Sequence, residues 1–228
     1  MPTKSQIEAQ KLYANLLEEV NLRIAAINHC TIGRSGLAPP FVKDFCYLQI
    51  RMLCELVALG CLVAHGDIKQ AASENMQRAW SADKIMDALE NLHPHFYPQP
   101  VKQTVTPAPA GMPKGHHLQA IQPHPFPKAD FIKLYHRCGE MLHRGNLRKL
   151  LKGQFPKQIN YPEITAKAQN IVNLLNNHAL VMKSGEQMFL AMLRNSADGK
   201  VQVAIAETPK GQPMDFASPN FLKDPPKV

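Results

Sequence analysis

The chain has 228 residues, of which 45% are hydrophobic and 19% are charged, and its formal net charge is +8. This length suits one domain with a core, or one domain plus a small appendage, and the composition excludes a disordered or fibrous protein. The five cysteines form no Cys-x-x-Cys pair. They therefore exclude a zinc-finger spacing and indicate buried, reduced thiols in a cytoplasmic protein.

The N-terminus lacks the apolar core of a signal peptide. The longest apolar run, residues 52–64, is interrupted by Glu55 and is shorter than a membrane-spanning helix requires. We therefore expect no membrane contact and a cytoplasmic location.

Two long helices are predicted first. Apolar residues recur at spacings of three to five over residues 5–28, close to the helical period. Residues 41–64 are apolar on nearly all sides, so this second helix should be the most buried element. Arg51 and Glu55 lie one helical turn apart inside it. We expect them to form a structural ion pair in apolar surroundings.

A short helix should follow Ser81 and run to about residue 92. Residues 98–127 then carry eight prolines, a density that no regular helix tolerates. We predict a long irregular insertion there, with residues 101–106 as a candidate short strand. Helices should resume at 128–143, with a continuation at 147–151, and at 162–177.

The last part of the chain changes its period. Residues 179–182, 188–193 and 201–205 are typical of strands, and Gly185 and Gly199 mark the turns between them. The predicted organisation is a mainly α protein with a helical bundle over residues 1–178, interrupted by the proline-rich insertion. An antiparallel β-meander over 179–208 and an irregular tail over 209–228 follow it.

Positive charge is concentrated in residues 131–160. Seven cations and one acid, Glu140, give this segment +6 of the net +8. The cations are Lys133, Arg137, Arg144, Arg148, Lys149, Lys152 and Lys157. Such a field attracts a polyanion, and RNA is the partner that we expect.

Arg137 and His143 lie six residues apart near the end of a late helix. Arg137-x5-His143 resembles the Arg-x4-6-His motif of the HEPN superfamily, and Arg51-x3-Glu55 resembles the Arg-x3-Glu of the buried early helix in that family. The resemblance covers the helices, from about residue 41 to residue 177. It departs from the family in its spacer of five and in Cys138, where a small polar residue is common.

The resemblance implies a HEPN-like bundle and a metal-independent endoribonuclease without a cofactor. Arg137 and His143 would be catalytic, because an arginine can stabilise a developing phosphorane charge and a histidine can transfer protons near neutral pH. On one ideal helix the two side chains point about 120° apart and lie ~9 Å apart along the axis. The resemblance therefore also implies a homodimer in which two motifs face each other.

Several residues around the motif are candidates for contacts with RNA phosphates or bases. They are Tyr135, Arg144, Asn146, Arg148 and Lys149. Such ribonucleases often act as toxins or in antiviral (phage) defence, a setting that includes a regulatory or antitoxin protein as a possible partner. The alternative is a catalytically inactive HEPN-like module that binds RNA or another protein.

A third hypothesis is a di-metal carboxylate protein. Glu-x-x-His occurs at Glu90–His93 and again at Glu140–His143, a spacing that places both side chains on one helix face. Glu19 and Glu55 would complete the ligand set, and His136 could join the second motif. The chain order differs from the ferritin-like pattern, and Arg137 and Arg144 oppose a cation, so we predict no metal site.

Overall fold

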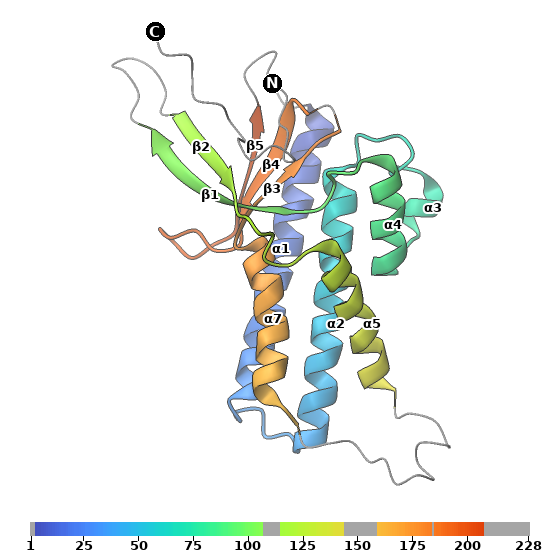
Figure 1. The fold of residues 1–228 in the computed structure, drawn as a ribbon, viewed down its shortest axis with the longest axis vertical. Coiled ribbons are helices and arrows are strands. Elements are labelled where there is room, and N and C mark those ends of the chain that lie inside the picture. Colours follow the sequence, from blue (N-terminus) through green and yellow to red (C-terminus); the bar gives the residue numbers. More distant parts are fainter. Residues whose placement is uncertain (1–2, 107–114, 144–158, 184, 208–228) are drawn as a thin grey trace.

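The computed structural model describes residues 3–106, 115–143, 159–183 and 185–207. A helical bundle forms most of the molecule, and a five-stranded antiparallel sheet lies over one end of it (Figure 1). The mainly α prediction is confirmed. The helices are α1 (Lys4–Thr31), α2 (Pro39–Ala64), α3 (Glu74–Gln77), α4 (Ala82–Leu92), α5 (Lys128–Leu142) and α7 (Tyr161–Leu175).

Helix α2 is the centre of the bundle. It begins at Pro39, where the missing N–H of proline costs no helical hydrogen bond. It packs against α1, α4, α5 and α7, which explains why apolar residues surround it. By length and composition α2 could cross a bilayer, although 56% of its most apolar window is buried inside the protein, as in the core helix of a bundle.

The sheet has the strand order β2-β1-β3-β4-β5. The predicted meander is confirmed as β3 (Asn177–Val181), β4 (Gln187–Met192) and β5 (Gln202–Glu207). The proline-rich insertion is more regular than we predicted. It contains β1 (Gln99–Thr106) and β2 (Gly115–Ala120), which pair with each other and project beyond the bundle (Figure 1).

The insertion joins the meander through a short pairing. Gln99 and Pro100 of β1 lie opposite Ala179 and His178 of β3. Among the described prolines, Pro98 precedes β1, Pro100 is its second residue, and Pro123, Pro125 and Pro127 lie between β2 and α5, so none interrupts the middle of a strand. The insertion therefore extends the C-terminal sheet instead of forming the irregular excursion that its composition predicted.

A buried hydrogen-bonded pair connects the sheet with the bundle. The Nδ1 of His178 lies 2.9 Å from the Leu175 carbonyl oxygen, which only accepts, so this nitrogen carries the proton of the neutral ring. The Tyr13 hydroxyl then donates to Nε2 over 2.5 Å. Burial lowers the pKa of His178 to about 4, which keeps the ring neutral at pH 7.

A second junction uses two more buried histidines. The Nε2 atoms of His65 and His93 lie 3.1 and 3.0 Å from the carbonyl oxygen of Val181 in β3. The two imidazole rings are 5.2 Å apart. Burial lowers the pKa of both rings, and the neighbouring ring lowers that of His93 further. The ends of α2 and α4 are thereby attached to the sheet through one peptide group.

Candidate functional site

Helix α5 carries the two predicted catalytic residues and is fixed to the bundle by its inner face. It begins after Pro127 and ends at Leu142, because the C-cap residue His143 has a ψ of 134°, outside the helical region. The residues on its inner face are Phe131, Leu134, Tyr135 and Cys138, all of which are buried. The outer face of the last two turns is exposed, and it is there that Arg137 and His143 lie.

The predicted pair of Arg51 and Glu55 is confirmed. The Nε of Arg51 lies 3.3 Å from Glu55 Oε1, and the two side chains are 23% and 14% exposed. The pair is thus largely but not fully buried. It also has a third member, because Arg51 Nη2 donates to the Tyr135 hydroxyl over 2.6 Å and that hydroxyl donates to Glu55 Oε1 over 3.3 Å.

Tyr135 is therefore not an RNA-contacting residue, and that prediction is wrong. Tyr135 is only 3% exposed. The guanidinium carbon of Arg51 lies over its ring, 4.1 Å from the centroid. Neither the ring face nor the hydroxyl remains available to a nucleotide base. Tyr135 instead joins α5 to α2. This structural function is consistent with its place on the apolar face of α5.

Arg137 is exposed and paired. Its side chain is 52% exposed, and Nη1 lies 2.9 Å from Glu140 Oε2, one turn further along α5. The hydrogen bond to Glu140 raises the pKa of the guanidinium, with smaller contributions from Tyr47 of α2 and Glu163 of α7. An exposed pair of this kind is worth little, on the order of 0.2–1 kcal/mol.

His143 caps α5 and is exposed. By ideal helix geometry its side chain leaves α5 about 120° away from that of Arg137. His136, one heptad earlier, lies on nearly the same side as His143 and contacts Asp83 of α4 at 3.2 Å. In one copy of the chain the side chains of Arg137 and His143 therefore leave α5 in different directions. A single site needs further movement or a second chain.

Charged residues on three helices meet beside Arg137. On α7, Lys167 Nζ lies 2.7 Å from Glu163 Oε1. Tyr47, on α2, also lies near enough to this carboxylate to contribute to lowering its pKa. Lys167 is the main cause of the lowered pKa of Glu163, and burial is the main cause that raises the pKa of Tyr47 to about 12. We call Tyr47, Arg51, Glu55, Arg137, Glu140, Glu163 and Lys167 the charged seam.

Sequence reasoning missed the α7 part of the charged seam. Glu163 and Lys167 are one turn apart, and Pro162 marks the first turn of the helix, so a local pair was readable from the sequence. The approach of Tyr47 and Arg137 depends on how α2 and α5 pack, and no local pattern contains that information.

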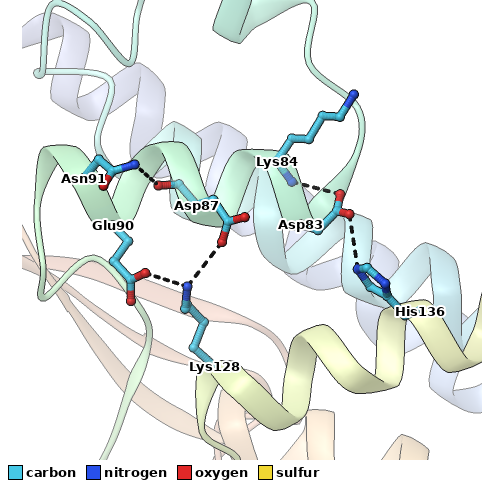
Figure 2. Close-up of polar contacts among 7 residues, drawn as sticks. All are labelled: Asp83, Lys84, Asp87, Glu90, Asn91, Lys128 and His136. Carbon is cyan, nitrogen blue, oxygen red and sulfur yellow. Dashed lines mark hydrogen bonds and ion pairs between the residues drawn. The ribbon is translucent and has the colours of Figure 1, made fainter.

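A second polar contact joins α4 and α5. Lys128 Nζ lies 3.3 Å from Asp87 Oδ1 and 2.7 Å from Glu90 Oε2 (Figure 2). His136 and Asp83 form the other end of this contact, and the pairs follow one side of the two helices (Figure 2). These interactions orient α5 against α4, so the carboxylates of Asp83, Asp87 and Glu90 have a structural role.

The geometry contradicts the di-metal hypothesis. Each glutamate that it required is paired with a cation. The pairs are Glu19 with Arg23, Glu55 with Arg51, Glu90 with Lys128 and Glu140 with Arg137. His93 is buried with its Nε2 on the Val181 carbonyl. Among the residues that the structure describes, no three His, Cys, Asp or Glu side chains are grouped as metal ligands would be.

The remaining predicted RNA contacts, Arg144, Asn146, Arg148 and Lys149, lie outside the described residues, as does the predicted helix at 147–151.

Comparison of the chain with protein-family models, with curated proteins and with solved structures found no match.

Proposed function

We propose that this chain is a HEPN-like, metal-independent endoribonuclease that acts as a homodimer, with Arg137 and His143 as its catalytic residues. The observation that carries the proposal is that the two faces of α5 differ. Its inner face is fixed to α2 through Tyr135, Arg51 and Glu55, while Arg137 and His143 remain exposed on its last turns. A reactive pair on a rigidly held helix end is what phosphodiester cleavage requires.

The chemistry follows from the two side chains. The imidazole of His143 takes the proton of a ribose 2′-hydroxyl, whose oxygen attacks the adjacent phosphorus. The guanidinium of Arg137 stabilises the charge that grows on the phosphoryl oxygens, through two parallel N–H donors. The P–O5′ bond breaks, and the leaving oxygen takes a proton from an imidazolium. The products are a cyclic 2′,3′-phosphate and a 5′-hydroxyl end.

A second copy of the chain supplies the missing geometry. Because Arg137 and His143 point to different sides of α5, a two-fold axis near the end of this helix would bring the arginine of one chain towards the histidine of the other. The homodimer is thus part of the proposal and not an addition to it.

The partners follow from charge. Arg144, Asn146, Arg148 and Lys149 continue directly from α5, and we propose that they bind the RNA backbone in a cytoplasmic toxin or antiviral setting. Glu140 favours one alternative. Since it already pairs with Arg137, an inactive RNA- or protein-binding module is the second candidate.

RNA cleavage with EDTA present tests the function. Wild type should cleave and leave cyclic phosphate ends, and His143→Ala and Arg137→Ala should each lose on the order of 10²-fold or more in rate. His29→Ala is the matched control, because His29 is an exposed histidine of α1 outside the site. If wild type binds RNA but neither it nor any variant cleaves it, the protein is the inactive binding module instead.

A further inference from the structure

Cleavage by the proposed mechanism needs a second proton carrier. While the imidazole of His143 accepts the proton of the 2′-hydroxyl, the 5′ oxygen must take a proton as it leaves. Three of the described histidines, His65, His93 and His178, are buried and face backbone carbonyl oxygens, so they do not reach a substrate. His136 differs from them, because it lies on the same helix as His143 and its side chain is 55% exposed.

Asp83 of α4 holds the ring of His136 (Figure 2). Its Oδ2 atom lies 3.2 Å from Nε2 of the imidazole. The other carboxylate oxygen, Oδ1, accepts a hydrogen bond from the Ser81 hydroxyl and another, over 2.8 Å, from the backbone N–H of Lys84. The side chain of Asp83 is 28% exposed. One oxygen of a partly buried carboxylate is thus fixed by the first turn of α4, and the other faces the histidine.

This contact decides which ring nitrogen of His136 can exchange a proton with a ligand. An ionised carboxylate only accepts hydrogen bonds, so Nε2 carries a proton in both the neutral and the charged ring. Nδ1 is then the nitrogen that gains and loses the second proton. A carboxylate that fixes the tautomer and the orientation of a histidine is a recurrent feature of proton-transfer catalysis.

His136 and His143 lie on one side of α5. Seven residues turn an ideal helix by about 700°, which returns the side chain to within about 20° of its first direction, and advance it by about 10.5 Å. Two imidazoles that approach each other from this separation can flank one phosphodiester group, whose attacking and leaving oxygens lie on opposite sides of phosphorus. The separation therefore suits a base and an acid that act on the same phosphate.

We propose that His136 is the general acid of the cleavage reaction and that Asp83 is its positioning residue. The inference rests on the proposed ribonuclease function and adds the group that protonates the leaving oxygen. His143 takes the proton of the 2′-hydroxyl, and the 2′ oxygen forms a bond to phosphorus. The P–O5′ bond breaks with its electron pair on O5′, which takes the proton from Nδ1 of the His136 imidazolium. His136 is left neutral and His143 protonated, and proton exchange with water restores both.

A structural role alone makes a different prediction. The contact of His136 with Asp83 also joins α5 to α4, as the contact of Lys128 with Glu90 does. If it does no more than that, its loss lowers the cleavage rate equally for every leaving group. If His136 protonates the leaving oxygen, the size of the loss depends on how strongly that leaving group needs a proton.

The test compares two single-stranded RNA oligonucleotides of one sequence with EDTA present. The first has ordinary linkages, and the second has sulfur in place of the 5′ bridging oxygen at the bond that wild type cleaves. The sulfur departs as a thiolate without a proton, because a thiol is far more acidic than a hydroxyl. His136→Gln should lose on the order of 10²-fold in rate on the oxygen linkage and less than about fivefold on the sulfur linkage.

Two further variants locate the effect. Asp83→Asn leaves the imidazole in place and should show the same pattern with a smaller loss, about tenfold on the oxygen linkage. His143→Ala should lose on the order of 10²-fold or more on both linkages, because the 2′-hydroxyl needs a base in either case.

Glu90→Gln is the matched control, since it removes a carboxylate of α4 from a cation of α5 without changing the His136 contact. It should cleave both oligonucleotides at the wild-type rate. Equal losses by His136→Gln on the two linkages, or a loss no larger than that of Glu90→Gln, would overturn the general acid and leave the ribonuclease function standing. Absence of cleavage of either oligonucleotide by wild type would refute the function and the general acid together.

Discussion

Arg51 and Tyr135 contact each other in two ways at once. Arg51 Nη2 donates to the Tyr135 hydroxyl over 2.6 Å, and the guanidinium carbon lies 4.1 Å from the centre of the same ring. A planar guanidinium can satisfy both contacts, whereas the point charge of a lysine cannot. The contact holds α5, the helix that carries Arg137 and His143, in one rotation against α2.

Removal of the Tyr135 hydroxyl should therefore be costly. Tyr135→Phe keeps the ring under Arg51 and removes one acceptor from Arg51 and one donor from Glu55. We expect a loss of about 1–3 kcal/mol in the free energy of unfolding, measured with urea, because both partners are charged and partly buried. Tyr161→Phe, at a half-exposed tyrosine in the first turn of α7, should change it by less than about 0.5 kcal/mol. Equal effects would place Tyr135 outside the network.

The pair of Arg51 and Glu55 should be stronger than a surface pair of the same spacing. Glu55→Ala leaves a cation that is 23% exposed without its carboxylate, and should cost roughly 1–3 kcal/mol and several degrees in Tm. Glu74→Ala also removes the glutamate of a pair, but at the surface, since Glu74 and Arg78 are one turn apart and 74% and 76% exposed. Its effect should stay below about 1 kcal/mol. Indistinguishable melting curves would contradict the buried position of Glu55.

Acid should destabilise the fold through its buried histidines. His178 has its pKa lowered to about 4 in the folded protein, whereas an unfolded histidine titrates near 6.5, so the unfolded chain binds an extra proton in between. The stabilisation from neutral His178 is complete above pH 6.5 and is lost as the pH falls towards 4, by up to about 3 kcal/mol. His65 and His93 act in the same direction.

Urea unfolding at pH 7 and at pH 5 measures this linkage, and the titration of the His178 ring protons by NMR gives its pKa directly. His29→Gln is the control, because His29 is exposed on α1. A His178 that titrates near 6.5 in the folded protein would contradict the buried neutral ring.

Gly60 is a position where a methyl group should not fit. A Cβ atom there would lie 2.7 Å from Cε2 of Tyr13, a ring that is itself buried. Although alanine favours a helix interior by about 1 kcal/mol over glycine, the overlap should cost roughly 1–3 kcal/mol, so Gly60→Ala should lower Tm. Gly66→Ala, whose Cβ would make only an ordinary contact at 3.4 Å, is the comparison. A rise in Tm for Gly60→Ala would show that Tyr13 can move.

RNA binding by the basic segment that follows α5 in the sequence can be tested by charge reversal. Arg148→Glu with Lys149→Glu should weaken binding of single-stranded RNA and reduce the salt slope by about 1.4 or more, two phosphate contacts. Lys4→Glu with Lys11→Glu makes the same change of net charge at exposed positions of α1. Equal losses in the two double variants would mean that net charge, and not the basic segment, governs binding.

The sequence by itself determined the elements with strong local patterns. The helices near 5–28, 41–64, 128–143 and 162–177 follow from apolar residues at the helical period, and the C-terminal meander follows from short apolar runs between glycine turns. These signals suffice because hydrogen bonds within a helix, and tight turns between strands, involve residues close together in the chain. The Arg51–Glu55 pair was predictable for the same reason.

Only the tertiary structure decided which partners those elements acquire. Tyr135 sits on the apolar face of α5, but its burial under Arg51 depends on the contact of α5 with α2. The strand pair in the proline-rich insertion gains its place from pairing with β3, about 78 residues later in the chain. His65 and His93 reach Val181 across 116 and 88 residues. Long-range packing selects such contacts, and no periodicity in the sequence records them.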